Sequence, residues 1–214
     1  MVVAIDGPSG VGKSTVARAV AHALGFGYLD TGAYYRMATL VALHRGVTPD
    51  DADGIRRALD HVDVDFVDGR LFLDGQDVSM DLRGPAVTGA VSEVSAHPSV
   101  RSTVVEMQRA WVARHGGRAV VEGRDIGTVV FPDAPVKVFL TADPETRARR
   151  RAADDEARGR PVETLMEQMA RRDGADSSRD ASPLRPADDA VIIDTSTLGV
   201  ADVVARVLDL VGKV

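Results

Sequence analysis

Eight residues near the N-terminus decide the fold of this chain: Gly7-Pro8-Ser9-Gly10-Val11-Gly12-Lys13-Ser14. They match the pattern G-x-x-x-x-G-K-[ST] at every fixed position. The short apolar run from Val2 to Ile5 precedes them and indicates a buried strand. From Lys13 onward the spacing becomes helical, with one apolar stripe formed by Val16, Val20 and Leu24. A strand, a glycine-rich turn and a helix in this order are what a phosphate-binding loop requires.

The residue types in this loop explain its chemistry. Glycines let the backbone curl so that successive N–H groups point inward at phosphate oxygens. Lys13 can reach the β- and γ-phosphates of a nucleotide, and the helix that follows directs its positive N-terminal end at the same anion. The Ser14 hydroxyl can bind Mg²⁺, so we expect Mg²⁺ to accompany ATP as the cofactor. The predicted ATP-binding residues are Gly7, Pro8, Ser9, Gly10, Val11, Gly12, Lys13, Ser14 and Thr15, with Ser14 as the metal contact.

Further apolar runs follow the first strand along the chain, and helical sequence separates them. Three such runs are 119–121, 136–140 and 191–193. Short apolar strands alternating with helices predict a parallel sheet covered by helices on both faces, which is an α/β fold. Gly25 and Gly27 are expected to end the first helix. Asp143 is a good N-cap for a helix that begins at Pro144.

Two regions depart from this alternation. Residues 62–78 alternate apolar and polar side chains around Asp68-Gly69 and Asp74-Gly75, which are hairpin turn signals. They predict a small antiparallel insertion within a long helical excursion from about Thr31 to Arg114. The second region, Arg147 to Arg185, holds ten basic and eight acidic residues, whereas the chain as a whole has a net charge of −6.

Composition narrows the classes of function. The chain has 214 residues and no cysteine, which excludes disulfides, thiolate metal sites and a cysteine nucleophile. Its net negative charge disfavours a nucleic-acid polymer or an anionic membrane as partner. No apolar stretch approaches the ~18 residues that span a bilayer. We therefore expect a soluble, cytoplasmic protein, and a monomer, since no heptad seam is present.

Several classes of P-loop protein do not fit. The guanine-binding motif N-K-x-D of GTPases cannot occur, because the sequence contains no asparagine. The L-S-G-G-Q signature of transporter ATPases is also missing. The chain has the size of a small-molecule kinase.

Three segments beyond the loop narrow the class further. They are Tyr28-Leu29-Asp30-Thr31-Gly32-Ala33-Tyr34-Tyr35-Arg36, Glu122-Gly123-Arg124-Asp125-Ile126-Gly127-Thr128-Val129-Val130-Phe131-Pro132, and Arg172-Asp173 through Arg179. Together with the opening Ile5-Asp6-Gly7-Pro8-Ser9-Gly10, they closely resemble the bacterial cytidylate kinase family over essentially the whole chain. The run G-R-D-x-G-T-V-V-F-P-D-A-P-V-K is far more specific than the P-loop.

The resemblance implies a nucleoside monophosphate kinase with a P-loop NTPase fold built on a five-stranded parallel sheet. It implies one kinase domain over residues 1–214, with an acceptor-binding region at about 31–115 and a lid at about 147–162. The implied reaction transfers the γ-phosphate of ATP to CMP or dCMP, giving ADP and CDP or dCDP.

The resemblance also implies roles for individual residues. Cytosine would be read by Ser92, Arg101 and Asp125. The sugar would lie near Thr31, Arg172 and Asp176. Phosphate would be held by Arg36, Arg124 and Arg179, which together with Lys13 form the expected catalytic set. In the lid, the candidates for reaching over the γ-phosphate are Arg147, Arg151 and Arg160, whereas Arg149, Arg158 and Arg185 fit a solvated helix face.

A carboxylate and a guanidinium suit the recognition of cytosine. Asp125 can accept a hydrogen bond from the exocyclic amine, and Arg101 can donate to the ring acceptors. Uracil would present a carbonyl to the carboxylate, at a cost of ~1–3 kcal/mol for each buried group left unpaired. Glu122 has two interpretations that stay open: it approaches Mg²⁺ through water, or it orients Arg124.

The chain departs from the family pattern in one place. Where related sequences often carry more arginines, this one has Ala175, Ser177 and Ser178.

Two rival functions share the P-loop: a kinase for another small acceptor, such as a sugar, shikimate or dephospho-coenzyme A, and a nucleotide-dependent switch without transfer activity. The first would not need a cytosine-reading aspartate, and the second would phosphorylate no monophosphate.

Overall fold

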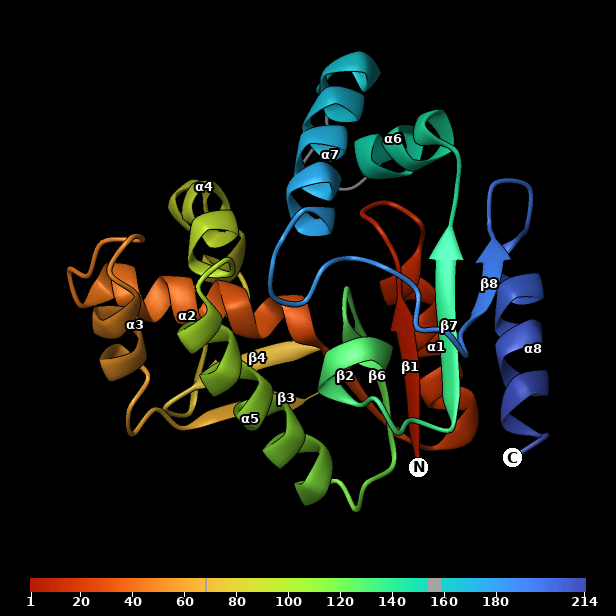
Figure 1. The fold of residues 1–214 in the computed structure, drawn as a ribbon, viewed down its shortest axis with the longest axis horizontal. Coiled ribbons are helices and arrows are strands. Elements are labelled where there is room, and N and C mark those ends of the chain that lie inside the picture. The colour runs from red at the N-terminus through yellow and green to blue at the C-terminus, as the bar shows by residue number, and fades with distance from the viewer. Residues whose placement is uncertain (68, 154–158) are drawn as a thin grey trace. The chain divides into compact units, whose positions relative to one another are not determined.

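The computed structural model describes residues 1–67, 69–153 and 159–214, and the chain divides into two compact units. Residues 1–27 and 117–214 form one, called here the P-loop unit, and residues 28–116 form the other, called the helical unit. Figure 1 shows the elements of both. The predicted acceptor-binding region, about 31–115, falls within the helical unit; its role stays a prediction.

A five-stranded sheet has the strand order β2-β6-β1-β7-β8. Its strands are β1 (Val2–Asp6), β2 (Gly27–Asp30), β6 (Ala119–Gly123), β7 (Val136–Thr141) and β8 (Val191–Asp194). The central strand β1 pairs in parallel with β6 on one side and with β7 on the other. Val3, Ala4 and Ile5 are fully buried, because a parallel strand covered on both faces has no solvent side. The predicted P-loop fold with a parallel sheet flanked by helices is confirmed.

Four helices belong to the P-loop unit among the described residues: α1 (Lys13–Leu24), α6 (Pro144–Ala153), α7 (Val162–Ser177) and α8 (Val200–Val211). Helix α1 packs against β6 and α8, and α8 packs against β7. Helices α6 and α7 pack on each other through buried Ala148, Leu165 and Met169 (Figure 1).

Local sequence signals set the ends of these helices. Gly25 ends α1 in the left-handed conformation, with φ of 62°. Pro144 is the first residue of α6, and the N–H of Thr146 donates to Asp143 Oδ1 at 2.8 Å. The predicted cap is therefore confirmed. Strand β2 was not predicted, because its four residues contain a glycine and only one fully buried side chain.

The helical unit holds the helices α2 (Thr31–His44), α3 (Ala52–Ala58), α4 (Pro85–Val94) and α5 (Pro98–Arg114), with a 3₁₀ turn η1 (Asp81–Arg83). The alternating segment forms a separate antiparallel sheet in the order β3-β4-β5, from β3 (Val64–Val67), β4 (Arg70–Leu73) and β5 (Gln76–Asp77). Positive φ angles at Asp74 and Gly75 allow the tight turn between β4 and β5. Asp68, predicted in the other turn, lies outside the described residues.

The core of the helical unit is built around Trp111. Its Nε1 donates to the Phe66 carbonyl at 3.0 Å, and the two rings meet edge to face at 6.4 Å. This contact fixes α5 against β3, because the buried indole N–H has found its acceptor. None of the helices in the described ranges is long and apolar enough to cross a membrane.

Candidate functional site: a phosphate-binding loop and two arginine clusters

The loop of residues 7–14, the P-loop, links β1 to α1 at the carboxyl edge of the sheet. Its glycines are required by close packing as well as by dihedral angles. A Cβ at Gly7 would lie 2.3 Å from the Leu140 carbonyl oxygen, and one at Gly10 would lie 2.7 Å from the Arg147 carbonyl oxygen. Both residues also have positive φ, at 146° and 78°. The loop therefore cannot accept a side chain at either position without displacing its neighbours.

A cavity of about 490 Å³ opens in front of the P-loop. The loop from Ser9 to Thr15 lines it, together with Arg124, Arg150, Arg151 and residues from the start of α8. Ser14 and Thr15 are exposed there, at the N-terminal end of α1. Free N–H groups at a helix N-terminus favour an anion. All predicted ATP-binding residues thus belong to one continuous segment, the P-loop and the start of α1, and from Ser9 onward they line one cavity.

Lys13 is nearly buried, and its Nζ donates to the Pro8 carbonyl at 2.7 Å. Burial, followed by the neighbouring charge of Arg124, holds the pKa of Lys13 well below its usual range. The charges of Glu122, Asp6 and Asp173 act in the opposite direction. A bound phosphate would add negative charge and favour the ammonium form.

Asp6, at the end of β1, was not among the predicted site residues. Its two carboxylate oxygens accept hydrogen bonds from the N–H groups of Ile126 and Gly127, each at 2.8 Å. Burial raises the pKa of Asp6 to about 6, although both hydrogen bonds lower it. Asp6 thereby ties the strand that carries the P-loop to the segment that carries Arg124 and Asp125.

The segment after β6 contains a π-helical turn, η2 (Ile126–Val130). Asp125 immediately precedes it and is buried, with 3% of its surface exposed. Single π turns occur often at functional sites, because they redirect side chains at the end of an element. Glu122, in β6, is buried as well. Its negative charge acts on Lys13, so the Glu122 carboxylate lies near the Lys13 ammonium.

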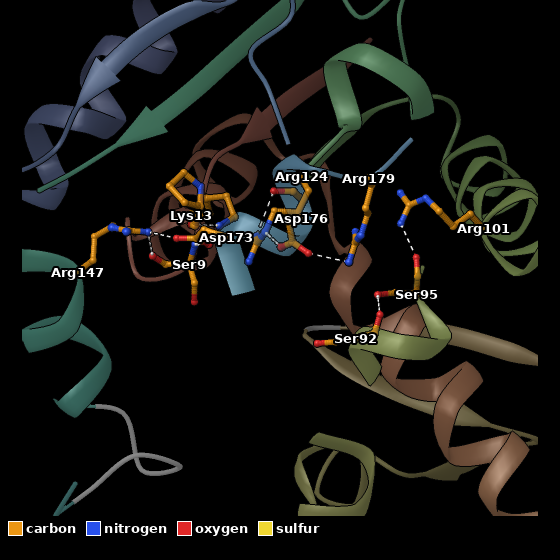
Figure 2. A network of polar contacts seen from close by, with 12 residues as sticks. Ser9, Lys13, Ser92, Ser95, Arg101, Arg124, Arg147, Asp173, Asp176 and Arg179 are labelled. Carbon is orange, nitrogen blue, oxygen red and sulfur yellow. Dashed lines mark hydrogen bonds and ion pairs between the residues drawn. The ribbon is translucent and has the colours of Figure 1, made fainter. Parts of the chain in front are cut away.

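Asp176 on α7 brings two of the predicted phosphate-binding arginines together. Its carboxylate accepts from Arg124 Nε at 3.0 Å and pairs with Arg179 Nη2 at 2.6 Å. Figure 2 shows Asp176 between the two guanidinium groups. The side chain of Asp176 is 6% exposed, and those of Arg124 and Arg179 are 20% and 13% exposed. One buried carboxylate thus balances two guanidiniums. Arg172, the other predicted site residue on α7, is exposed on that helix.

A second cluster joins α6 and α7 to the P-loop itself. Asp173 Oδ1 accepts a hydrogen bond from the Ser9 N–H at 3.2 Å, and Asp173 Oδ2 forms a short ion pair with Arg147. Arg147 Nη1 also donates to the Ser9 carbonyl at 3.1 Å (Figure 2). Arg147 was predicted to act in the lid, but Asp173 was missed as a site residue.

Arg150 was also missed. Its guanidinium donates to Thr195 and to the Val11 carbonyl, and the Thr195 hydroxyl donates to Val11 as well. These contacts support the P-loop from the side of β8. Arg151 lines the cavity, and Arg160 donates to Gln168 at 2.7 Å. Residues 154–158 of the predicted lid, which include Arg158, lie outside the described residues.

The helical unit carries the other predicted acceptor residues. Arg36 on α2 donates to the Leu82 carbonyl at 3.0 Å and to Thr88 Oγ1 at 3.1 Å. Thr31 begins α2 and is buried, and its carbonyl accepts from Gln108 Nε2 at 3.5 Å. The N-cap of this helix is Asp30, which accepts from the Gly32 N–H at 2.9 Å.

Arg101 on α5 is 5% exposed, which is unusual for an arginine. Its guanidinium lies over the Tyr35 ring, with 5.0 Å between Cζ and the ring centroid, and Nη1 donates to the Ser95 carbonyl at 3.1 Å. Ser95 Oγ in turn donates to the carbonyl of Ser92 (Figure 2). Ser92 itself lies on α4 and is exposed. A buried arginine held in one orientation suits the recognition of a planar group with hydrogen-bond acceptors.

Among the described residues, no group of three or more His, Cys, Asp or Glu side chains could hold a metal ion. The donors that fit Mg²⁺ here are oxygens at the P-loop, above all the exposed Ser14 hydroxyl. Mg²⁺ commonly binds through one or two protein oxygens plus substrate phosphates and water. A nucleotide-borne Mg²⁺ is therefore compatible with these residues.

Comparison with known proteins agrees with this geometry. The family model described as "Cytidylate kinase" matches residues 3–213. A cytidylate kinase from Mycobacterium avium is 54% identical over 99% of this chain and 95% of its own length, and one from Rhodococcus opacus is 51% identical over 100% and 95%. Among solved structures, a sugar kinase from Janibacter sp. HTCC2649 aligns with a TM-score of 0.50 at 16% identity, covering 99% of this chain and 94% of that one. At that identity, the likeness supports the fold alone.

Proposed function

Because this chain belongs to the cytidylate kinase family, we propose that it transfers the γ-phosphate of ATP to CMP or dCMP, giving ADP and CDP or dCDP. The observation that carries the proposal is the pairing of Arg124 and Arg179 on one carboxylate within the unit that carries the P-loop. Two adjacent guanidiniums form a binding place for a phosphate of the acceptor. The P-loop supplies the place for the donor.

The donor side is assigned to the P-loop. Its backbone N–H groups and the N-terminus of α1 would hold the β- and γ-phosphates, and Lys13 would neutralise charge on the transferred group. Mg²⁺, held by Ser14 together with the nucleotide, would supply further neutralisation of the phosphate oxygens. Asp6 keeps the loop attached to η2, so that the donor and acceptor residues of this unit are fixed to one framework.

The acceptor side is assigned to the remaining predicted residues. Arg36, Arg124 and Arg179 would bind the acceptor phosphate and align its oxygen for in-line attack. Ser92, Arg101 and Asp125 would read the cytosine, and Thr31, Arg172 and Asp176 would contact the sugar. Buried Arg101 and Asp125 support this assignment, because a donor and an acceptor that are desolvated discriminate strongly against a base with the wrong pattern.

No general base is needed for this reaction, because the phosphate of CMP is already anionic near neutral pH. Phosphoryl transfer depends mainly on positioning and on charge stabilisation. The protein would therefore contribute arginines, lysine and oriented N–H groups, and closure of the lid would exclude water that otherwise hydrolyses ATP. The predicted single kinase domain and the lid at 147–162 are part of this proposal.

The test is an ADP-release assay with a panel of acceptors: CMP, dCMP, UMP, AMP and shikimate. We expect turnover with CMP and dCMP that clearly exceeds turnover with the others. Preferred phosphorylation of shikimate or AMP would contradict the proposal, and so would ATP binding without transfer to any acceptor. We further propose that the protein acts as a cytoplasmic monomer without nucleic-acid or membrane partners; sedimentation of the purified chain tests the oligomeric state.

A further inference from the structure

Asp173 makes a contact that the proposed reaction does not require. Its carboxylate accepts the Ser9 N–H of the P-loop and is paired with Arg147, and both side chains are largely buried, at 14% and 12% exposure. A P-loop N–H is a group that the proposed function assigns to a nucleotide phosphate. Here a carboxylate of the same chain takes that hydrogen bond (Figure 2).

The position of Ser9 indicates which phosphate is concerned. Lys13 Nζ, the group that reaches the β- and γ-phosphates, donates to the carbonyl of Pro8, the residue just before Ser9. The peptide between Pro8 and Ser9 therefore lies beside the Lys13 ammonium. The charge of Asp173 is also felt by Lys13, so the carboxylate, the ammonium and the Ser9 N–H are neighbours.

Arg147 is held in the same cluster. Nη1 is shared between the Asp173 carboxylate and the Ser9 carbonyl, whereas Nε is buried without a hydrogen-bond partner in the described part of the chain. An unsatisfied buried donor on a charged group is unfavourable. A phosphate oxygen could accept from this guanidinium once Asp173 has moved away.

We propose that Asp173 is an internal competitor for the terminal phosphate of ATP, and that it thereby sets the preference of the site between ATP and ADP. The inference rests on the proposed function, because it assumes that the P-loop binds the donor nucleotide. A carboxylate and a γ-phosphate that use the same N–H and the same arginine repel each other, so ATP displaces Asp173. ADP has no γ-phosphate, and Asp173 keeps its contact beside it.

The packing of α6 and α7 makes this exchange local. The backbone of Arg147 approaches Gly10 so closely that a Cβ there would lie 2.7 Å from the Arg147 carbonyl oxygen, and the Cε of Met169 would lie at the same distance. Met169 and Asp173 are one helical turn apart on α7, so the helix rests against the P-loop through this face. Release of one ion pair changes how α6 and α7 contact the loop, and loss of the γ-phosphate on transfer lets the carboxylate return.

The test compares the dissociation constants of ATP and ADP by titration calorimetry, without CMP, in the wild type and in Asp173→Asn. Removing the charge should tighten ATP binding about tenfold, which is 1.4 kcal/mol, and ADP binding by less than about threefold. Glu167→Gln is the matched control, because it removes one negative charge from an exposed residue of the same helix. It should change neither constant by more than about threefold.

Two outcomes overturn the proposal: equal changes for ATP and ADP, or weaker binding of ATP by Asp173→Asn. The titrations are done both with Mg²⁺ and with a chelator. If Asp173→Asn tightens ATP binding with the chelator but weakens it with Mg²⁺, Asp173 contacts the metal instead and the proposal is overturned. Asp173→Ser is measured beside Asp173→Asn, so that a folding defect of one variant does not remove the test. Transfer from ATP to CMP by the wild type is assayed separately; its absence would overturn the proposed function and leave the comparison of ATP with ADP intact.

Discussion

Among single substitutions, one that removes the Asp176 carboxylate should have the largest effect on the stability of the ligand-free protein. Asp176 pairs with Arg124 at 3.0 Å and with Arg179 at 2.6 Å, and only 6% of its side chain is exposed. Asp176→Asn keeps the shape but removes the buried carboxylate that the two guanidiniums share. Breaking a buried ion pair by removing one partner is expected to lower the free energy of unfolding by about 3 kcal/mol. For a chain of this length, that corresponds to a melting temperature lower by about 9 °C.

The assay is thermal and urea unfolding of wild type and variant, followed by circular dichroism in buffers without phosphate or nucleotide. Asp189→Asn is the control, because Asp189 pairs with Lys137 at 2.8 Å but is 66% exposed. Its loss should lower stability by less than about 1 kcal/mol. The two substitutions are chemically identical. The difference between their losses of stability therefore reports the effect of burial and of the second arginine.

A phosphate should partly restore the variant. Without Asp176, the two guanidiniums no longer share a carboxylate, so inorganic phosphate should raise the melting temperature of Asp176→Asn more than that of the wild type. The reasoning would be refuted if Asp176→Asn were no less stable than Asp189→Asn. It would also be refuted if phosphate stabilised the wild type more strongly than the variant.

Three further predictions concern the P-loop, the base and the pH dependence. Lys13→Ala should lower kcat at least about 100-fold in the ADP-release assay while far-UV circular dichroism stays unchanged, because charge on the transferred phosphoryl group loses its neutralising ammonium; near-normal turnover would contradict the mechanism. Asp125→Asn should lower the ratio of kcat/KM for CMP over UMP about tenfold, and an unchanged ratio would show that Asp125 does not read the base. Asp6 has a pKa raised from 3.8 to about 6 in the folded state, so its protonated form adds stability at low pH that is lost as pH rises through 6. The free energy of unfolding of the wild type, relative to Asp6→Asn, should therefore fall by about 2 kcal/mol between pH 4.5 and 7.5, and a difference that does not change with pH would contradict the assignment.

The P-loop could be predicted from the sequence because its determinants are local. A strand, a loop and a helix that follow one another need only the dihedral freedom of the glycines and the periodicity of the apolar residues. The same holds for the cap at Asp143 and for the alternation that forms β3, β4 and β5. Strand β2 escaped prediction because four residues, one of them Gly27, carry too weak a pattern to be separated from the end of a helix.

The candidate site residues named from the family pattern are a different case. Sequence similarity predicted that Arg124, Asp176 and Arg179 belong to one site. It did not show that one carboxylate pairs with both arginines in the free protein. Nor did it single out Asp6, Asp173 or Arg150, since each is an ordinary charged residue in its local context.

The sequence by itself determined the class of fold, the donor-binding loop and the family, because these depend on contiguous residues and on patterns that survive without knowledge of contacts. Only the tertiary structure decided which charges are neighbours. Asp173 lies 164 residues from Ser9, and Asp6 lies 120 residues from Ile126, yet each pair forms a hydrogen bond. No local rule encodes such pairs, because a carboxylate can pair with any donor that the packing of strands and helices brings within about 3 Å.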